Sequence, residues 1–258
     1  MGEANRNQRR KQAFLNEHQW CCYCGGSTRA TTVDHVPSRQ MFTGKRRPKG
    51  LEVPACDPCN QATRQHEQVA AMLGRIYPDG PTKEERSETR RIVHAVGQNV
   101  PGLLEELQAS ANQRKHFARS GVELDGIGGV LNCSGPLLNR SIQIFGAKLG
   151  FALHYLQTGR IIPLQGSVFV RWYSNYDAMT KGIPPQIFAI LGEPETLRQG
   201  QWSVETQFNY AYAIADSRRM AAYFSTFRLS FAVLSVAHED GSELASFDDA
   251  QVHLPGKF

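Results

Sequence analysis

The sequence predicts an α+β protein in which a small cysteine-rich N-terminal module is followed by helices and by a C-terminal α+β domain with an antiparallel sheet. Three observations indicate this. Two Cys-x-x-Cys pairs lie within residues 18–77. Residues 139–157 carry apolar side chains at helical spacing and stop near Gly159, as an amphipathic helix does. Runs of β-branched and aromatic residues then follow, as in a half-buried sheet.

Composition places the chain among ordinary globular proteins. It has 258 residues, 41% of them apolar, and 29 Lys plus Arg against 24 Asp plus Glu, a net charge of +5. These values exclude a fibrous or wholly disordered chain. No apolar run approaches the roughly 20 residues of a membrane-spanning helix. The basic N-terminus has no apolar core after it, so we expect no secretory signal, no membrane partner and a cytoplasmic location.

The positive charge gathers at one end of the chain. Residues 1–50 hold ten Lys or Arg and three acids, a net +7, whereas the remaining residues sum to −2. Such a basic end indicates a polyanionic partner. The alternative interpretation is a solvated basic tail without a partner.

Four of the six cysteines form two pairs, Cys21-x-x-Cys24 and Cys56-x-x-Cys59. Two residues between thiols let a tight turn bring both sulfurs to one ion, and two such turns complete a tetrahedral zinc site. The sequence therefore predicts structural Zn²⁺ on these four residues. A redox pair is the alternative, although no redox strand–helix pattern accompanies either pair. The other two cysteines, Cys22 and Cys133, are expected to be ordinary buried or half-buried residues.

The segment between the pairs carries residues suited to hydrolysis. Residues 31–36 and 51–55 read as strands, and residues 61–76 as a helix. Asp34 and Asn60 offer oxygen ligands for Mg²⁺. His35 alternates to the other side of the strand and can take a proton from an attacking water. The residues expected to contact nucleic-acid phosphates in the loop between the strands are Lys45, Arg46, Arg47 and Lys49.

Together these residues resemble a known family. The strings CCYCGG, TTVDHVPSRQMF and LEVPACDPCNQATRQHE, all within residues 18–77, are similar to the zinc-bound HNH endonucleases. The resemblance implies a zinc-clamped ββα-metal (HNH) module that uses the four paired cysteines. It implies His35 as general base, and Asp34 and Asn60 as ligands of a catalytic Mg²⁺ or Mn²⁺.

The sequence departs from the family pattern in two places. Gly50 or Leu51 stands where the family has a middle Asn, so the group that orients the base is not identified. Arg64 stands where some members place a His ligand, and a guanidinium binds phosphate rather than a metal. Glu67 shares a helical face with Asn60 and either supports the site or is an ordinary exposed residue.

The segments are expected to be a basic N-terminal segment (1–17), the zinc-bound module (18–77), a helical linker (78–120) and the C-terminal domain (121–258). In the linker, Thr82 is expected to cap a helix, and a second helix is expected after Pro101. The strands expected in the C-terminal domain are residues 167–173, 186–191, 203–213 and 227–236. The glycine-rich residues 126–129 lack the context of a nucleotide-binding loop.

The leading prediction is a metal-dependent HNH endonuclease that hydrolyses DNA, with RNA not excluded as a substrate. The resemblance implies a role in restriction or phage defence. One alternative is a non-catalytic zinc module that binds nucleic acid. Another is an effector whose C-terminal domain recognises a protein or small-molecule regulator and holds the nuclease silent. A His35→Ala change separates catalysis from binding alone.

Overall fold

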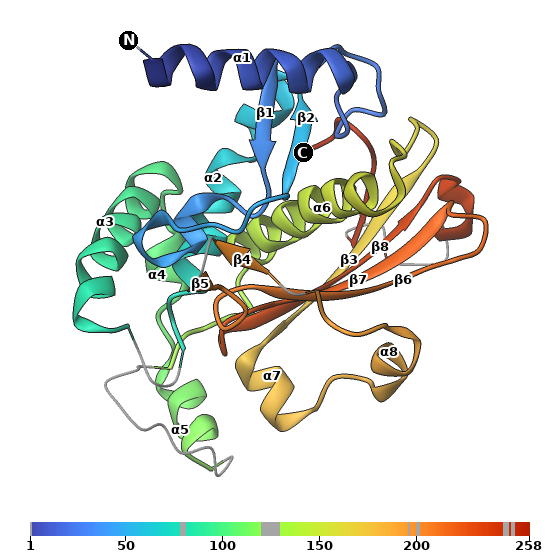
Figure 1. The fold of residues 1–258 in the computed structure, drawn as a ribbon. Coiled ribbons are helices and arrows are strands. Elements are labelled where there is room, and N and C mark those ends of the chain that lie inside the picture. Colours follow the sequence, from blue (N-terminus) through green and yellow to red (C-terminus); the bar gives the residue numbers. More distant parts are fainter. Residues whose placement is uncertain are drawn as a thin grey trace.

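The computed structural model describes residues 2–77, 81–119, 130–195, 197–199, 202–244, 248 and 251–258. Residues 78–80 of the expected linker and the glycine-rich residues 126–129 lie outside these ranges. Figure 1 shows a two-stranded hairpin and several helices on one side of a central helix, and a five-stranded sheet on the other. Among the described helices, none has the length and apolar character needed to cross a membrane.

The N-terminal part contains two helices and one hairpin. Helix α1 (Gly2–Glu17) covers the basic N-terminal segment, for which no helix was predicted. Strands β1 (Thr32–His35) and β2 (Glu52–Ala55) pair antiparallel and confirm the two expected strands. Helix α2 (Asp57–Leu73) follows directly and begins four residues before the expected start, because Pro58 fits the first helical turn.

The chain between the hairpin and the central helix is largely helical. Two short 3₁₀ turns, η1 (Arg39–Met41) and η2 (Thr43–Lys45), lie in the loop between β1 and β2. Helix α3 (Lys83–Asn99) begins at the expected cap, since Thr82 and Glu85 form a reciprocal capping box. Two shorter helices complete this part, α4 (Leu103–Glu106), after Pro101 as expected, and α5 (Ala111–Arg119).

The C-terminal part is an antiparallel sheet with strand order β6-β7-β8-β3-β9. Its strands are β3 (Ser167–Ser174), β6 (Asn209–Ile214), β7 (Met220–Phe227), β8 (Phe231–His238) and β9 (Val252–His253). The smaller elements are α7 (Asn175–Thr180), α8 (Pro185–Ile190), β4 (Arg198–Gln199), β5 (Trp202–Ser203) and η3 (Gly241–Leu244). The predicted antiparallel sheet is confirmed.

Three of the four expected strand ranges need correction. Residues 186–190 of the expected strand 186–191 are helical, as part of α8, because Pro185 occupies the first turn and favours a helix start. Residues 203–213 contain the end of β5, a turn and β6, rather than one strand. Residues 227–236 span the end of β7, a turn at residues 228–230 and most of β8, and the prediction missed β7 itself. Apolar content alone does not mark where a strand reverses.

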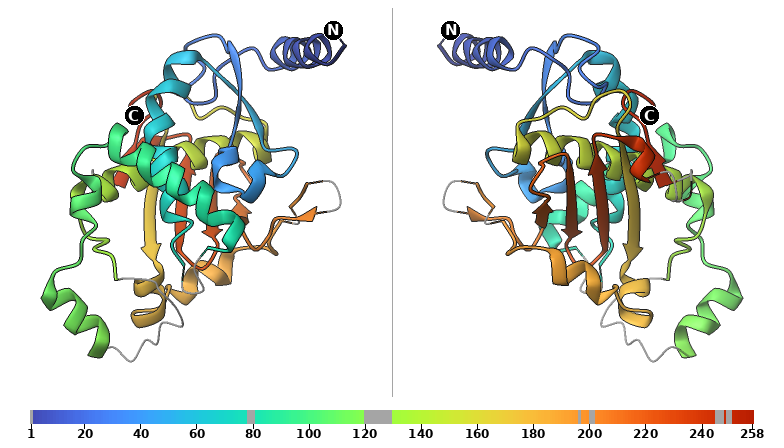
Figure 2. Two further views of the ribbon diagram at one scale, coloured as in Figure 1. Left: turned by 90° about the vertical axis from the view of Figure 1, so that its left-hand side faces the viewer. Right: turned by 90° about the vertical axis from the view of Figure 1, so that its right-hand side faces the viewer.

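Helix α6 (Pro136–Thr158) is the central element and ends at Gly159, as expected. It packs against α2 on one side and against β3 and β8 on the other (Figure 2). On the sheet side, a Cβ at Gly146 would stand 2.5 Å from a Val170 methyl, and one at Gly150 would stand 2.6 Å from a Val168 methyl. The two glycines therefore permit the close approach of α6 to the sheet.

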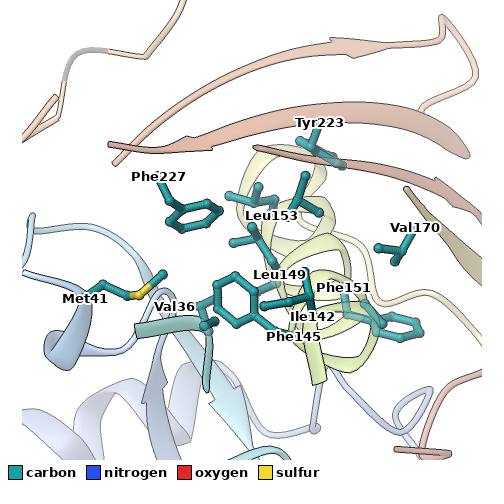
Figure 3. Packing of buried hydrophobic residues seen from close by; sticks show 14 of the residues in the cluster. Val36, Met41, Ile142, Phe145, Leu149, Phe151, Leu153, Val170, Tyr223 and Phe227 are labelled. Carbon is teal, nitrogen blue, oxygen red and sulfur yellow. The ribbon is translucent and has the colours of Figure 1, made fainter. Parts of the chain in front are cut away.

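The larger of two hydrophobic clusters among the described residues runs through both parts of the molecule. Figure 3 shows Val36 and Met41 from the N-terminal part beside Phe145 of α6, with Tyr223 and Phe227 of the sheet above them. All five side chains are at most 4% exposed. The hairpin is thus held against the sheet domain by shared apolar packing. The expected domain boundaries at residues 77 and 120 stay a prediction.

Candidate metal centre and active site

The four paired cysteines come together at one end of the hairpin. Their sulfur atoms all lie within 4.8 Å of one another, and all four residues are buried. The first pair is tied to β2, because the backbone N–H of Cys22 donates to Pro54 O at 3.0 Å. The second pair spans the start of α2. Four cysteines at this spacing could hold a zinc ion, so the predicted cluster is confirmed and its donor set fits zinc.

One thiol of the cluster is already acidic. The Cys59 thiol donates to Cys21 Sγ, and this hydrogen bond lowers the pKa of Cys21 to about 5. The same hydrogen bond raises the pKa of Cys59, so the two thiols share one proton between them. Zinc binds thiolates and would displace this proton. Outside the cluster, burial raises the pKa of Cys22 well above its ordinary value and that of Cys133 to about 11. These two cysteines are the ordinary buried and half-buried residues that the sequence predicts.

His35 lies on β1 directly opposite Glu52 of β2. Its Nδ1 is 3.6 Å from Glu52 Oε1, and its side chain is 27% exposed. Burial, followed by the nearby Arg47, lowers the pKa of His35 to about 4, so the imidazole is neutral at pH 7. Sequence reasoning missed Glu52, although pairing in an antiparallel hairpin with β-strand alternation could have identified it.

Two arginines, Arg10 and Arg47, act on this pair, and a third, Arg39, acts on Arg47. Arg47 is half-buried, and Arg10 of α1 reaches Glu52 Oε2 with Nη2 at 3.4 Å. Both guanidinium groups act to lower the pKa of His35. The pKa of Arg47 is itself lowered, mainly by burial and further by repulsion from the positive charges of Arg39 and Arg10. The cluster supplies positive charge beside the exposed edge of the imidazole, and the predicted set missed Arg10 and Arg39.

The other predicted nucleic-acid contacts lie on the surface. Lys45, Arg46 and Lys49 are exposed in the loop between β1 and β2, and Arg64 is exposed on α2. The loop is anchored by Phe42, which is fully buried and meets Phe208 of the sheet domain edge-on at 6.4 Å. The buried Phe42 therefore anchors the loop, while its charged side chains lie in solvent.

Asp34 points to the inside of the molecule rather than toward solvent. Its Oδ2 accepts a hydrogen bond from Tyr23 OH at 2.8 Å and lies 2.7 Å from Lys148 Nζ. Its Oδ1 accepts from the backbone N–H of His35 at 2.8 Å. Both oxygens are therefore engaged, and the residue is 8% exposed.

Comparison with known proteins assigns no family. No family model matches the chain, and neither a curated protein nor a solved structure matches it. Its function is therefore inferred from the geometry of its own residues. The resemblance of residues 18–77 to the HNH endonucleases stays a prediction.

The donor set around Asp34 does not fit a divalent ion as the chain is folded. Within the described ranges, the four cysteines are the one group of three or more His, Cys, Asp or Glu side chains placed to hold a metal. Asn60 is half-buried in the first turn of α2. Mg²⁺ takes a carboxylate oxygen as a direct ligand, and the carboxylate of Asp34 already meets an ammonium. Asp34 and Asn60 as ion ligands stay a prediction.

Two neighbours on α2 face the sheet domain. Glu67 is 7% exposed, and its Oε2 lies 3.1 Å from Lys148 Nζ, so the alternative of an exposed glutamate is wrong. Burial raises the pKa of Glu67 to about 7, against the opposing influence of Lys148. His66 instead meets Ser141, with Nδ1 and Oγ 3.3 Å apart, and burial lowers its pKa to about 4. His66 therefore belongs to the α2–α6 contact.

A cavity of about 540 Å³ lies beside α5 and α7, and neither His35 nor the four clustered cysteines line it. Its lining is largely apolar and includes Phe117, Leu131 and Tyr176, with Asn112 and Asp177 among the polar groups. The cavity is large enough for a small molecule. It offers room for a small-molecule regulator of the kind the sequence suggests, and such a regulator stays a prediction.

Proposed function

We propose that β1, β2, α2 and the four clustered cysteines form a zinc-clamped ββα module that hydrolyses phosphodiester bonds of DNA. His35 acts as general base. The observation that carries the proposal is the pairing of a neutral, partly exposed His35 with Glu52, beside Arg10 and Arg47. A base oriented by a carboxylate and facing a cationic surface is suited to attack on a phosphodiester. The resemblance to HNH endonucleases agrees with this assignment.

The chemistry follows from the contacts of His35. Glu52 holds Nδ1, so Nε2 is the nitrogen that takes a proton from water as the oxygen attacks phosphorus. The contact of 3.6 Å is longer than a hydrogen bond, and such contacts tighten when substrate binds. The bond from phosphorus to the leaving sugar oxygen then breaks, and that oxygen takes a proton from solvent.

The arginines have two effects on the reaction. Arg10, Arg39 and Arg47 bind the phosphate oxygens and stabilise the charge that develops on them. A bound phosphate also neutralises these arginines, which removes their effect on His35. The pKa of His35 then rises above about 4, although burial still holds it below its ordinary value, and the imidazole becomes a somewhat stronger base. Substrate binding and activation of the base are coupled in this way.

A second candidate is a zinc-dependent module that binds DNA without cleaving it. The ion pair between Asp34 and Lys148 favours it, because a divalent ion supplies charge stabilisation in metal-assisted hydrolysis and Asp34 is not free to hold one. An effector activated by a partner is a variant of this candidate, in which cleavage begins once α6 moves.

The test is conversion of supercoiled plasmid by zinc-loaded protein with Mg²⁺ or Mn²⁺ in the buffer. We expect His35→Ala to lower the cleavage rate by about 10²–10⁴-fold and to leave DNA binding unchanged. Glu52→Gln should lower the rate less, also without loss of binding. His94→Ala is the matched control, because His94 is exposed on α3. Cleavage that persists in His35→Ala would contradict the proposed role of this residue.

A further inference from the structure

The side chain of Lys148 is the strongest unexplained feature of the molecule. It is the only Lys, Arg, Asp or Glu between residues 141 and 158, and it is 0% exposed. Its Nζ bridges two carboxylates from different elements, Asp34 of β1 at 2.7 Å and Glu67 of α2 at 3.1 Å. An ammonium removed from water carries a large desolvation cost that only such pairing offsets.

The position of the ammonium is set by the packing of α6. Lys148 is two residues from Gly146 and two from Gly150, so it projects from the opposite side of the helix. The two glycines lie against the sheet, and Ser235 Oγ of β8 donates to Gly146 O at 2.9 Å. Because the helix is fixed to the sheet in this way, Lys148 reaches the N-terminal module from a rigid base.

The groups around the ammonium are those of a cation site. Asp34 Oδ2 accepts from Tyr23 OH as well, and the ammonium lies 5.4 Å from the centre of the Tyr23 ring. Glu67 Oε1 is buried and has no hydrogen-bond partner among the described residues. Asn60 lies two turns before Glu67, on the same face of α2. Two carboxyl groups from different elements therefore share a single ammonium.

We propose that Lys148 occupies the cation position between Asp34 and Glu67 and thereby excludes a divalent ion from Asp34. The sheet domain thus supplies, from its own helix, the positive charge that a metal ion supplies in a metal-dependent site. A divalent ion reaches Asp34 only when Lys148 is removed or α6 is displaced. The inference rests on the proposed function only in that Asp34 adjoins the proposed base.

Lys148 thereby fixes the charge that lies beside His35. With Lys148 in place, Asp34 keeps its hydrogen bond to the backbone N–H of His35, which holds the base at the end of β1. Withdrawal of the ammonium would leave two buried carboxylates facing each other, a strongly unfavourable arrangement. Any movement of α6 is therefore coupled to a change in the charge beside His35.

The test is calorimetric titration of Mn²⁺ into zinc-loaded protein without DNA. We expect the wild type to show no Mn²⁺ binding that depends on Asp34. Lys148→Met keeps the length of the side chain and removes its charge, and should bind one Mn²⁺ at least about tenfold more tightly than the wild type. The double variant Lys148→Met/Asp34→Asn should lose that binding. Circular dichroism and zinc content check that each variant is folded.

Two results would overturn the inference. One is Mn²⁺ binding by the wild type that Asp34→Asn abolishes, which needs no Lys148 variant and decides the matter even if Lys148→Met does not fold. The other is a folded Lys148→Met that binds no Mn²⁺. Because the titration contains no nucleic acid, its outcome is independent of whether the protein cleaves DNA.

Discussion

Two buried anionic sites border the same hairpin, and they are balanced in different ways. The four cysteines at one end bring four sulfur atoms within 4.8 Å of one another, a donor set that suits a zinc ion taken from solution. The pair formed by Asp34 and Glu67 contains an ammonium that the chain itself provides. The difference teaches that one module can carry a site built for a metal and a site built to do without one.

The largest expected effect follows from removing the metal of the first site. Complete chelation of zinc should unfold the N-terminal module, because structural zinc contributes about 10–16 kcal/mol of apparent binding free energy in small zinc modules. Far-UV circular dichroism and thermal melting measure the loss. Cys133→Ser should behave as wild type, since Cys133 lies outside the cluster. An unchanged spectrum and melting curve after complete zinc removal would contradict the assignment.

Removing the internal cation of the second site should have the next largest effect. Lys148→Met is expected to lower the free energy of unfolding by about 3–5 kcal/mol, because it leaves two buried carboxyl groups without the ammonium that they share. Urea unfolding measures this at constant zinc content.

Two control variants test whether the loss of stability in Lys148→Met comes from the buried charges. The triple variant Asp34→Asn/Glu67→Gln/Lys148→Met should recover most of the loss, since it removes every charge of the cluster. Lys181→Met breaks an exposed pair with Asp177 and should cost less than about 1 kcal/mol. Equal losses of stability in Lys148→Met and Lys181→Met would contradict the claim that the buried ion pairs of Lys148 stabilise the fold.

These two sites also show which site residues can be predicted from the sequence. The cysteines were predicted because each pair is local and its spacing reflects the geometry of tetrahedral zinc. Lys148 was not predicted, since its partners lie on β1 and α2 and only the packing of α6 brings them together. Glu52 lies between these cases, because the register of a hairpin is needed to place it opposite His35.

The same distinction holds for the fold. Helix α6 was predicted nearly to its ends, because a long periodic apolar pattern and a glycine cap are strong local signals. The strands of the sheet were predicted with wrong limits. Residues 227–236 are mainly apolar, with Arg228 and Ser230 as the polar residues of the turn. The reversal at residues 228–230 depends on Arg228 adopting a φ of +51°, a backbone conformation that an arginine in a sequence does not indicate.

A smaller effect is expected where α6 meets the sheet. Gly146→Ala would place a methyl 2.5 Å from Val170 Cγ1 and 2.9 Å from Val233 Cγ1. We expect a loss of about 1–3 kcal/mol of stability from overpacking, measured by urea unfolding. Arg140→Ala, at an exposed position of the same helix, should change stability by less than about 0.5 kcal/mol. A neutral Gly146→Ala would mean that α6 is not held against the sheet as described.

The smallest expected effects concern the pKa of His35, which proton NMR of the imidazole measures. Arg47 lowers this pKa and Glu52 raises it, around a value of about 4 that burial sets. Arg47→Ala should therefore raise the pKa, and Glu52→Gln should lower it, each by less than about one pH unit. His35 is neutral above its pKa in every variant, so activity should fall only in acid. Shifts in the opposite directions would contradict the arrangement of charges around the base.

The most direct test of the contrast between the two sites is elemental analysis of protein purified from medium that contains Zn²⁺, Mg²⁺ and Mn²⁺. The account predicts one zinc per chain, lost in Cys56→Ser/Cys59→Ser, and no second divalent ion in the wild type. Protein without zinc, or a second bound ion that disappears in Asp34→Asn, would contradict it.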